Sequence, residues 1–310
     1  LGDKTATQGE VYASRGGKQV FLIAAYVESS FAKSTFDLRE KSVLAVERDK
    51  VDRVEVEAPG QSLAVAKAGS EWRLEKPVQA PADYGTVESL VGRIQTAQMK
   101  SIAAQQATDL KQYGLDKPEA TVTLSAGSSR AALAIGGKDE SGNHYAKDAS
   151  RPLVFTVEAG LLEELKKPAG DLRNKDVFAF RPFNATGIET TRASEVFAFE
   201  KAKGAGKDAE EKWRRVKPSV KDVDQAKVDD LLARLSNLRA QAFEGGQAKT
   251  GIDTPVLVVV ATFDEGKKKE RVVFGRSGSD VFASIEGQPG AAKIDAAEFD
   301  QALKALDALK

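Results

Sequence analysis

Apolar and polar residues alternate along several stretches of the chain, which is the pattern of half-buried strands. Two such stretches, 52–57 and 62–67, are separated by Ala58-Pro59-Gly60-Gln61, a sequence typical of a hairpin turn. Further strands are predicted at 72–75, 120–125, 130–135, 144–147 and 153–157. The pattern therefore predicts strands that are connected mostly by hairpins.

Apolar residues also recur at the i, i+3, i+4, i+7 spacing of one helix face, at Val87, Leu90, Val91 and Ile94. Asp83 stands where a helix N-cap is expected. Residues 108–113 predict a short helical turn ended by Gly114, and residues 159–167 predict another helix. Strict βαβ alternation is absent, which argues against a Rossmann or barrel fold. We therefore expect an α+β fold with mostly antiparallel sheets and inserted helices.

The same pattern occurs more than once. The run from Trp72-Arg73 to Lys76-Pro77 returns 141 positions later as Trp213-Arg214 to Lys217-Pro218. Asp37-Leu38-Arg39 returns 134 positions later as Asp171-Leu172-Arg173. This spacing is far beyond the roughly 20–50 residues of solenoid repeats, so each unit should be a domain with its own core.

Three segments follow from these matches. Residues 1–46 resemble the C-terminal half of an incomplete repeat, 47–180 a complete α+β repeat, and 181–310 a second, more divergent one. The half-repeat indicates either a fragment of a longer chain or a genuine truncated copy. The second complete unit carries about eight extra polar residues within 200–212, and we predict a surface hairpin tip there, because interleaved acidic residues argue against a basic binding arm.

Composition excludes several classes of function. The 310 residues contain 46 Lys+Arg and 46 Asp+Glu, so the general basic field of a nucleic-acid-binding protein is absent. No Cys and a single His exclude disulfides, thiolate chemistry and multi-histidine metal sites. The longest apolar runs, 20–27 and 256–263, are short of the roughly 20 residues of a membrane helix, and no signal-peptide pattern is visible at the first residues.

No motif for phosphate, dinucleotide or acyl-transfer chemistry is present. His144 is the only candidate base for a serine relay, but its counterparts in the other units are Val11 and Val281, which favours a strand residue. Asn184-Ala185-Thr186 matches the glycosylation triplet, which is frequent by chance.

Other residues recur at matched positions, and each has a structural and a functional interpretation. Asp83 and Asp224 precede helices, where capping explains them. The recurring Asp-Leu-Arg ends could form an ion pair, pin the loop to the next unit or bind a substrate. For Trp72 and Trp213, core packing is favoured over a platform that binds sugars. Packing is also favoured for Tyr12, Tyr145 and Phe282, because a position shared by Tyr and Phe does not need a hydroxyl. We therefore predict no catalytic, cofactor-binding or metal-binding residues and no cofactor.

The motifs from Trp72-Arg73-Leu74-Glu75-Lys76-Pro77 through Tyr113-Gly114-Leu115-Asp116-Lys117-Pro118 to Asp171-Leu172-Arg173 are distinctive. They resemble the bacterial domain of unknown function 4340 family. The resemblance implies a membrane anchor, not present in this chain, followed by repeated soluble domains outside the cytoplasm, periplasmic or otherwise extracytoplasmic. It also implies association with ABC-transporter components of the gliding-motility type, and it transfers no catalytic residues.

We therefore expect a non-enzymatic accessory or scaffold subunit of an ABC-transporter-like membrane complex. One alternative is a ligand-binding module that uses a cleft between repeats, and another is a carboxylate-dependent hydrolase. A scaffold predicts partner contacts along sheet edges, whereas a binding module predicts a concave cleft. We also expect residues 1–46 to pack against 47–180 or against another chain, because a half-repeat exposes a sheet edge and an apolar face.

Overall fold

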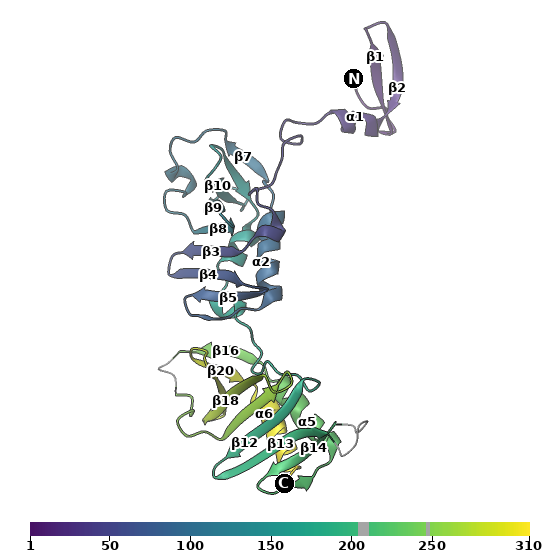
Figure 1. The fold of residues 1–310 in the computed structure, drawn as a ribbon. Coiled ribbons are helices and arrows are strands. Elements are labelled where there is room, and N and C mark those ends of the chain that lie inside the picture. Colours follow the sequence, from purple (N-terminus) through teal and green to yellow (C-terminus); the bar gives the residue numbers. More distant parts are fainter. Residues whose placement is uncertain (204–210, 246–248) are drawn as a thin grey trace. The chain divides into compact units, whose positions relative to one another are not determined.

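The computed structural model describes residues 1–203, 211–245 and 249–310 (Figure 1). Most of the predicted hairpin tip at 200–212 lies outside these residues. The chain divides into two compact units, the first made of residues 1–61 and 90–166 and the second of residues 62–89 and 167–310. None of the helices in the described part combines the length and apolar content that crossing a bilayer requires.

The first large sheet has nine strands in the order β6-β5-β4-β3-β8-β9-β10-β11-β7. Its strands are β3 (Arg53–Ala58), β4 (Gln61–Ala68), β5 (Glu71–Lys76), β6 (Ala80–Pro81), β7 (Ser101–Ala104), β8 (Ala120–Ala126), β9 (Ser129–Lys138), β10 (His144–Asp148) and β11 (Val154–Val157). The helical segments are η1 (Arg48–Lys50), α2 (Tyr84–Thr96), η2 (Lys111–Tyr113), α3 (Ala159–Leu165) and α4 (Ala169–Leu172).

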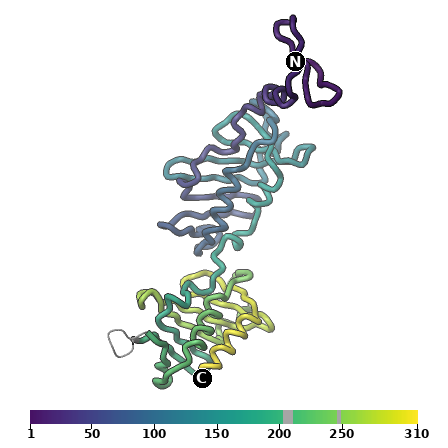
Figure 2. The backbone as a smooth tube through the Cα atoms, turned by 90° about the vertical axis from the view of Figure 1, so that its right-hand side faces the viewer, coloured from purple at the N-terminus to yellow at the C-terminus, as the bar shows by residue number. Residues whose placement is uncertain are grey.

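The second large sheet has the order β15-β14-β13-β12-β17-β18-β19-β20-β16, so every strand has a counterpart in the first. Its strands are β12 (Ala185–Arg192), β13 (Glu195–Lys203), β14 (Glu211–Lys217), β15 (Lys221–Asp222), β16 (Ala240–Glu244), β17 (Leu257–Phe263), β18 (Lys268–Ser277), β19 (Asp280–Ile285) and β20 (Ala291–Ile294). Helices α5 (Gln225–Ser236) and α6 (Ala296–Asp307) contact each other and the sheet (Figure 2). The predicted α+β class with antiparallel sheets is confirmed.

The sequence pattern accounts for most of these elements. The stripe at Val87, Leu90, Val91 and Ile94 is buried on α2. The turn that closes at Gly114 needs a left-handed residue, with φ +65°, and it lies so close to β9 that a Cβ on Gly136 would come within 2.3 Å of the Tyr113 carbonyl oxygen. Gly251 (φ +69°) and Gly275 make the same close approach in the second sheet, which explains why both glycines recur.

Segments that precede each large sheet are part of its fold. The amide of Val43 donates to the Ala97 carbonyl and that of Met99 to the Lys41 carbonyl, at 3.3 and 2.8 Å. The amides of Val177 and Ala240 make the same bonds, at 3.1 and 2.7 Å, to Leu238 and Lys175. Phe178 and Phe180 are fully buried in the core of the second sheet. The boundaries at 46/47 and 180/181 stay a prediction.

The N-terminal segment forms a separate two-stranded sheet of β1 (Glu10–Arg15) and β2 (Gln19–Ala24), followed by α1 (Ala25–Phe31). Its antiparallel register matches that of β10 and β11, because Ala13 pairs with Phe21 as Ala146 pairs with Phe155. Within the described residues β2 pairs with β1 alone, whereas β11 pairs with both β10 and β7. The hairpin therefore has the pairing register of β10 and β11, and one edge of β2 is unpaired within the described residues.

Candidate functional site

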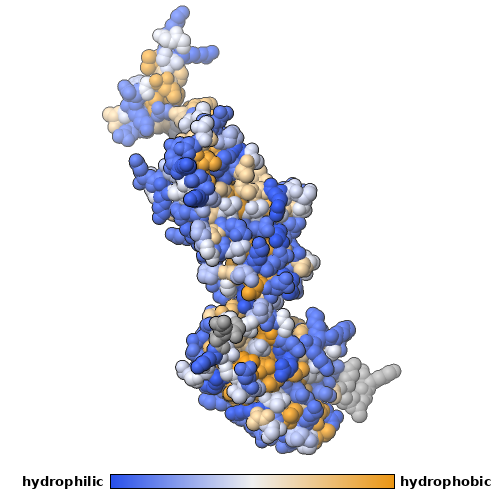
Figure 3. All heavy atoms as spheres, turned by 90° about the vertical axis from the view of Figure 1, so that its left-hand side faces the viewer, coloured by the Kyte–Doolittle hydropathy of each residue, from blue (hydrophilic) through white to orange (hydrophobic). Residues whose placement is uncertain are grey.

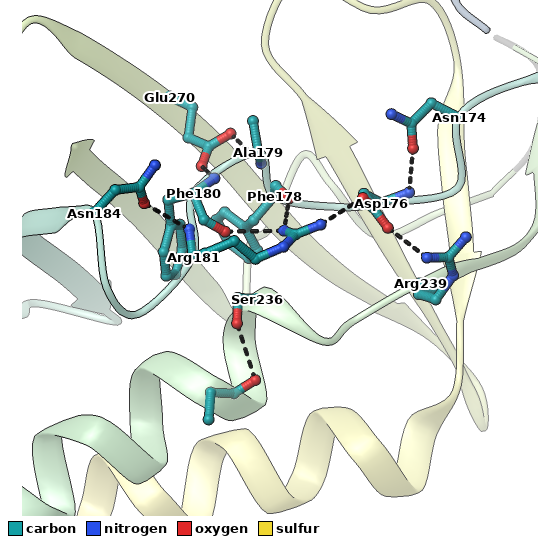
Figure 4. A network of polar contacts seen from close by, with 11 residues as sticks. Asn174, Asp176, Phe178, Ala179, Phe180, Arg181, Asn184, Ser236, Arg239 and Glu270 are labelled. Carbon is teal, nitrogen blue, oxygen red and sulfur yellow. Dashed lines mark hydrogen bonds and ion pairs between the residues drawn. The ribbon is translucent and has the colours of Figure 1, made fainter. Parts of the chain in front are cut away.

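A network of charged groups surrounds the segment that leads into the second large sheet (Figure 4). The Asp176 carboxylate accepts hydrogen bonds from Arg181 Nη2 at 2.7 Å and from Arg239 Nη1 at 2.6 Å. Arg181 also donates through Nη1 to the carbonyl oxygens of Phe178 and Phe180, at 3.0 and 2.9 Å. These bonds fix the backbone turn that places the two phenylalanines in the core.

Glu270, on β18, holds the other side of the same segment. Its two carboxylate oxygens accept the backbone N–H groups of Ala179 and Phe180, at 2.9 and 3.0 Å. Burial raises the pKa of Glu270, while the two N–H bonds and the nearby Arg181 charge act in the opposite direction. The carboxylate therefore acts as an acceptor for backbone groups that would otherwise lie unpaired next to the core.

The possible glycosylation triplet belongs to the same network. Asn184 accepts the Arg181 backbone N–H at 2.8 Å and donates through its amide nitrogen to Asp264 at 2.9 Å. The pKa of Asp264 is lowered, first by its hydrogen bond with Lys268. Both ends of the Asn184 side chain thus have a structural role in the turn.

A cavity of about 490 Å³ lies beside this network, within the second compact unit. Its wall includes Glu71, Trp72, Asp83, Asp176, Arg181 and Glu270. The carboxylates of Asp176 and Glu270 accept the hydrogen bonds described above. The Asp83 carboxylate accepts hydrogen bonds from Thr86 N and Oγ1, at 2.8 and 2.7 Å. The cavity can accommodate a polar molecule, and no group of three or more acidic or histidine side chains with metal-binding geometry occurs in the described residues.

In the first large sheet the corresponding segment is held by a different charged group, in which Arg151 donates to the Asp148 carboxylate at 2.8 Å and to the Ser42 carbonyl oxygen at 3.0 Å. The positions that match Asp176 and Arg239 carry Ser42 and Gln98, which form the same backbone bridge. Sequence reasoning missed the network because it searched for residues that recur, whereas Asp176, Arg239 and Glu270 differ from their counterparts. A search for charged residues that replace uncharged ones at matched positions of the two repeats would have found it.

The residues singled out from the sequence lie in structural positions. His144 is buried in β10 with Nδ1 2.8 Å from the Gly136 carbonyl oxygen. Asp224 caps α5 by accepting the Ala226 N–H. Trp72 and Trp213 are buried at matched places on β5 and β14, and Trp72 Nε1 donates to Glu88 at 2.9 Å. These tryptophans pack in the core, as the sequence analysis favoured.

The Asp-Leu-Arg ends differ from one another. Asp37 accepts from Ser34 N and Oγ, which lowers the pKa of this exposed carboxyl. Arg173 is buried, and its guanidinium carbon lies 3.6 Å from the centroid of the Phe243 ring. These contacts attach the loop that carries Arg173 to residues later in the chain. The matched aromatic residues Tyr12, Tyr145 and Phe282 also differ in their surroundings. Tyr12 is exposed, Phe282 is buried, and the Tyr145 ring packs edge-on against Tyr113.

A second surface stands out at the N-terminal hairpin. Large apolar side chains on β2 and α1 are exposed, namely Val20 (73%), Phe21 (44%), Leu22 (45%), Tyr26 (73%) and Phe31 (80%). Figure 3 shows hydrophobic surface on this segment. Exposed apolar side chains beside an unpaired strand edge favour association with a partner, so this segment is a candidate interaction site.

Comparison with known proteins gives one result. The profile of a family described as a domain of unknown function (DUF4340) matches residues 1–77 and again residues 72–255. No curated protein and no solved structure matches the chain. The two matches cover most of the sequence, and the chain therefore belongs to the DUF4340 family, of which it carries tandem copies.

Proposed function

We propose that this chain is a non-enzymatic scaffold subunit that works outside the cytoplasm in an ABC-transporter-like membrane complex. It binds a partner chain through the N-terminal hairpin, where an extended segment of the partner adds as a strand to the open edge of β2. The complex is of the gliding-motility type that the family resemblance implies.

The exposed β2 strand is the observation that carries this proposal. β11, its counterpart in the first large sheet, is buried along its full length, with Val154 and Phe155 fully inaccessible. The same pairing register in β1 and β2 leaves the equivalent side chains, Val20 and Phe21, exposed. A two-stranded hairpin is only marginally stable in water, so added pairing and apolar cover would stabilise it.

The charged network supports a non-catalytic role. The carboxylates of Asp176 and Glu270 are both held by donors that stabilise the local fold. A hydrolase that uses two carboxylates needs one as an acid and one as a base or nucleophile, free to reach the substrate. Residues fixed in this way hold the turn that leads into the second large sheet.

The test is capture from detergent-solubilised membranes of the source cells with the chain immobilised at its C-terminus. We expect transporter subunits among the captured proteins and a loss of at least tenfold in their amount with V20K/L22K. Lysine side chains at a strand edge oppose edge-to-edge pairing, and both positions are exposed.

The matched control is V220K/F183K, which changes two exposed apolar residues elsewhere in the chain. This variant should capture the same subunits as the unmodified chain. Equal capture by both variants, or the absence of any transporter subunit, would contradict the proposal.

A ligand-binding module is the second candidate, because the 490 Å³ cavity beside Asp176 and Glu270 is the concave feature that such a module requires. Native mass spectrometry of the chain purified from its own cells tests it. A bound small molecule that is absent from a D176A/E270A variant would favour this function, and a ligand-free mass for the unmodified chain would argue against it.

A further inference from the structure

Arg173 is a buried cation whose hydrogen-bond partners in the described part of the chain are all neutral. Its side chain and backbone together are only 6% exposed. Nη2 donates to the Pro289 carbonyl oxygen at 3.3 Å and lies 3.5 Å from Gln288 Oε1, and Nε is buried with no hydrogen-bond partner in the described residues. Burial lowers the pKa of the guanidinium. A buried charge without an opposite charge is unfavourable, so its retention requires an explanation.

The backbone of Arg173 is held firmly, which makes the side chain's position a built feature. Asp83 N–H donates to the Leu172 carbonyl at 2.8 Å, and Asn174 N–H donates to the Pro81 carbonyl at 2.9 Å. Arg173 itself bridges to Ala82 between these two bonds. The guanidinium carbon lies over the Phe243 ring, 3.6 Å from its centroid, and such a contact favours Arg over Lys.

A cavity of about 290 Å³ adjoins this guanidinium. Its wall contains Arg173 and the apolar side chains of Leu74, Pro77, Val78, Phe243 and Pro289. This volume is near the lower limit of small-molecule pockets, and the combination of an apolar wall with one cation suits a ligand that has an apolar body and one negative charge. Glu244 also lines the cavity, and it forms no ion pair with Arg173 within the described residues.

We infer that this cavity binds a small aliphatic carboxylate, with its apolar body against Leu74, Val78 and Phe243 and its carboxylate paired with Arg173. The carboxylate supplies the opposite charge that the guanidinium lacks. The site does not depend on the scaffold proposal, because it lies in the second compact unit and the open edge of β2 lies in the first.

The N-terminal counterpart of this position lacks these features. Arg39, which matches Arg173, is exposed. Phe243 pairs with Ala292 on β20, and Ile102 makes the equivalent pair with Phe155 on β11. Ile102 therefore stands at the position of Phe243 in the first large sheet, and it offers no ring for an arginine side chain. The carboxylate site is therefore specific to Arg173.

The experiment is a titration of the full chain at low ionic strength. Binding is measured by isothermal titration calorimetry and by NMR of the arginine Nε–H signals. The probes are 4-methylpentanoate, its neutral amide 4-methylpentanamide, and inorganic phosphate. We expect the acid to bind at least tenfold more tightly than either the amide or phosphate and to shift the Arg173 signal. Equal affinity for acid and amide, equal affinity for acid and phosphate, or no binding of the acid would overturn the inference.

Two variants locate the site. R173Q should weaken binding of 4-methylpentanoate at least tenfold, and E244Q should strengthen it at least twofold, because the Glu244 charge opposes the bound carboxylate. Unchanged binding in R173Q, or weaker binding in E244Q, would contradict the assignment. If R173Q does not fold, the comparison of the three probes on the unmodified chain still decides the question.

Discussion

The β1–β2 hairpin and the β10–β11 hairpin have the same pairing register but very different surroundings. In the second hairpin, β11 is covered by β7 on its outer edge and its residues are buried. In the first, the equivalent strand has an open edge and exposed Val20, Phe21 and Leu22. Local sequence therefore specifies the hairpin, while burial is supplied by the remaining strands of the unit.

The largest expected difference concerns the matched phenylalanines of the two hairpins. F155A should lower the free energy of unfolding by about 3–5 kcal/mol, because Phe155 is fully buried and its removal leaves a cavity. F21A should change it by about 0.5 kcal/mol or less, as expected for an exposed position. Urea denaturation followed by circular dichroism measures both. A large loss for F21A would mean that β2 is covered in the free chain.

The charged network sharpens the comparison between the segments that lead into the two sheets. D176A should cost about 1–2 kcal/mol, a value between those of an exposed and a buried ion pair, because Arg181 and Arg239 both lose their acceptor. S42A, at the matched position, should have a smaller effect. The same denaturation experiment gives both values, and an equal cost would show that the charges add nothing to the shared backbone pairing.

The smallest expected effect separates two aspartates with similar hydrogen bonds. D83A should cost about 1 kcal/mol, because Asp83 caps α2, which carries part of a buried core. D37A should leave the unfolding midpoint unchanged, because Asp37 lies in an exposed turn. Thermal unfolding at pH 7 tests the pair.

The pH dependence of the Asp83 contribution has a defined sign. The hydrogen bonds from Thr86 lower the folded-state pKa of Asp83 below its ordinary value of 3.8. The stabilisation is therefore complete above that ordinary value, and it is lost as the pH falls through the lowered folded-state pKa. The difference in stability between the unmodified chain and D83A should be constant from pH 7 to 5 and shrink at lower pH. A difference that grows on acidification would contradict this cause.

The sequence was sufficient for elements with a strong periodic pattern. The α2 stripe, its Asp83 cap and the β3–β4 hairpin all follow from local residues. β7 and β6 were not predicted, because the Ser-Ile-Ala-Ala sequence of β7 does not alternate between polar and apolar residues and β6 has only two residues. Their pairing depends on partners far away in the sequence, which no local pattern specifies.

The candidate sites divide in the same way. Recurring residues such as Trp72 and Asp224 were correctly read as core and cap residues, since both roles follow from local pattern. The stacking of Arg173 on Phe243 joins residues 70 positions apart, so the sequence left its role open between three alternatives. The hydrogen bonds of Glu270 to Ala179 and Phe180 were missed for the same reason.

The central claim is that a partner segment pairs with the outer edge of β2, which is unpaired within the described residues. Hydrogen exchange followed by mass spectrometry, on the free chain and on the captured membrane complex, tests it most directly. The account predicts fast exchange of the Gln19–Ala24 amides in the free chain, slow exchange at Val154–Val157, and protection of Gln19–Ala24 alone on complex formation. Slow exchange of Gln19–Ala24 in the free chain, or unchanged exchange there in the complex, would contradict it.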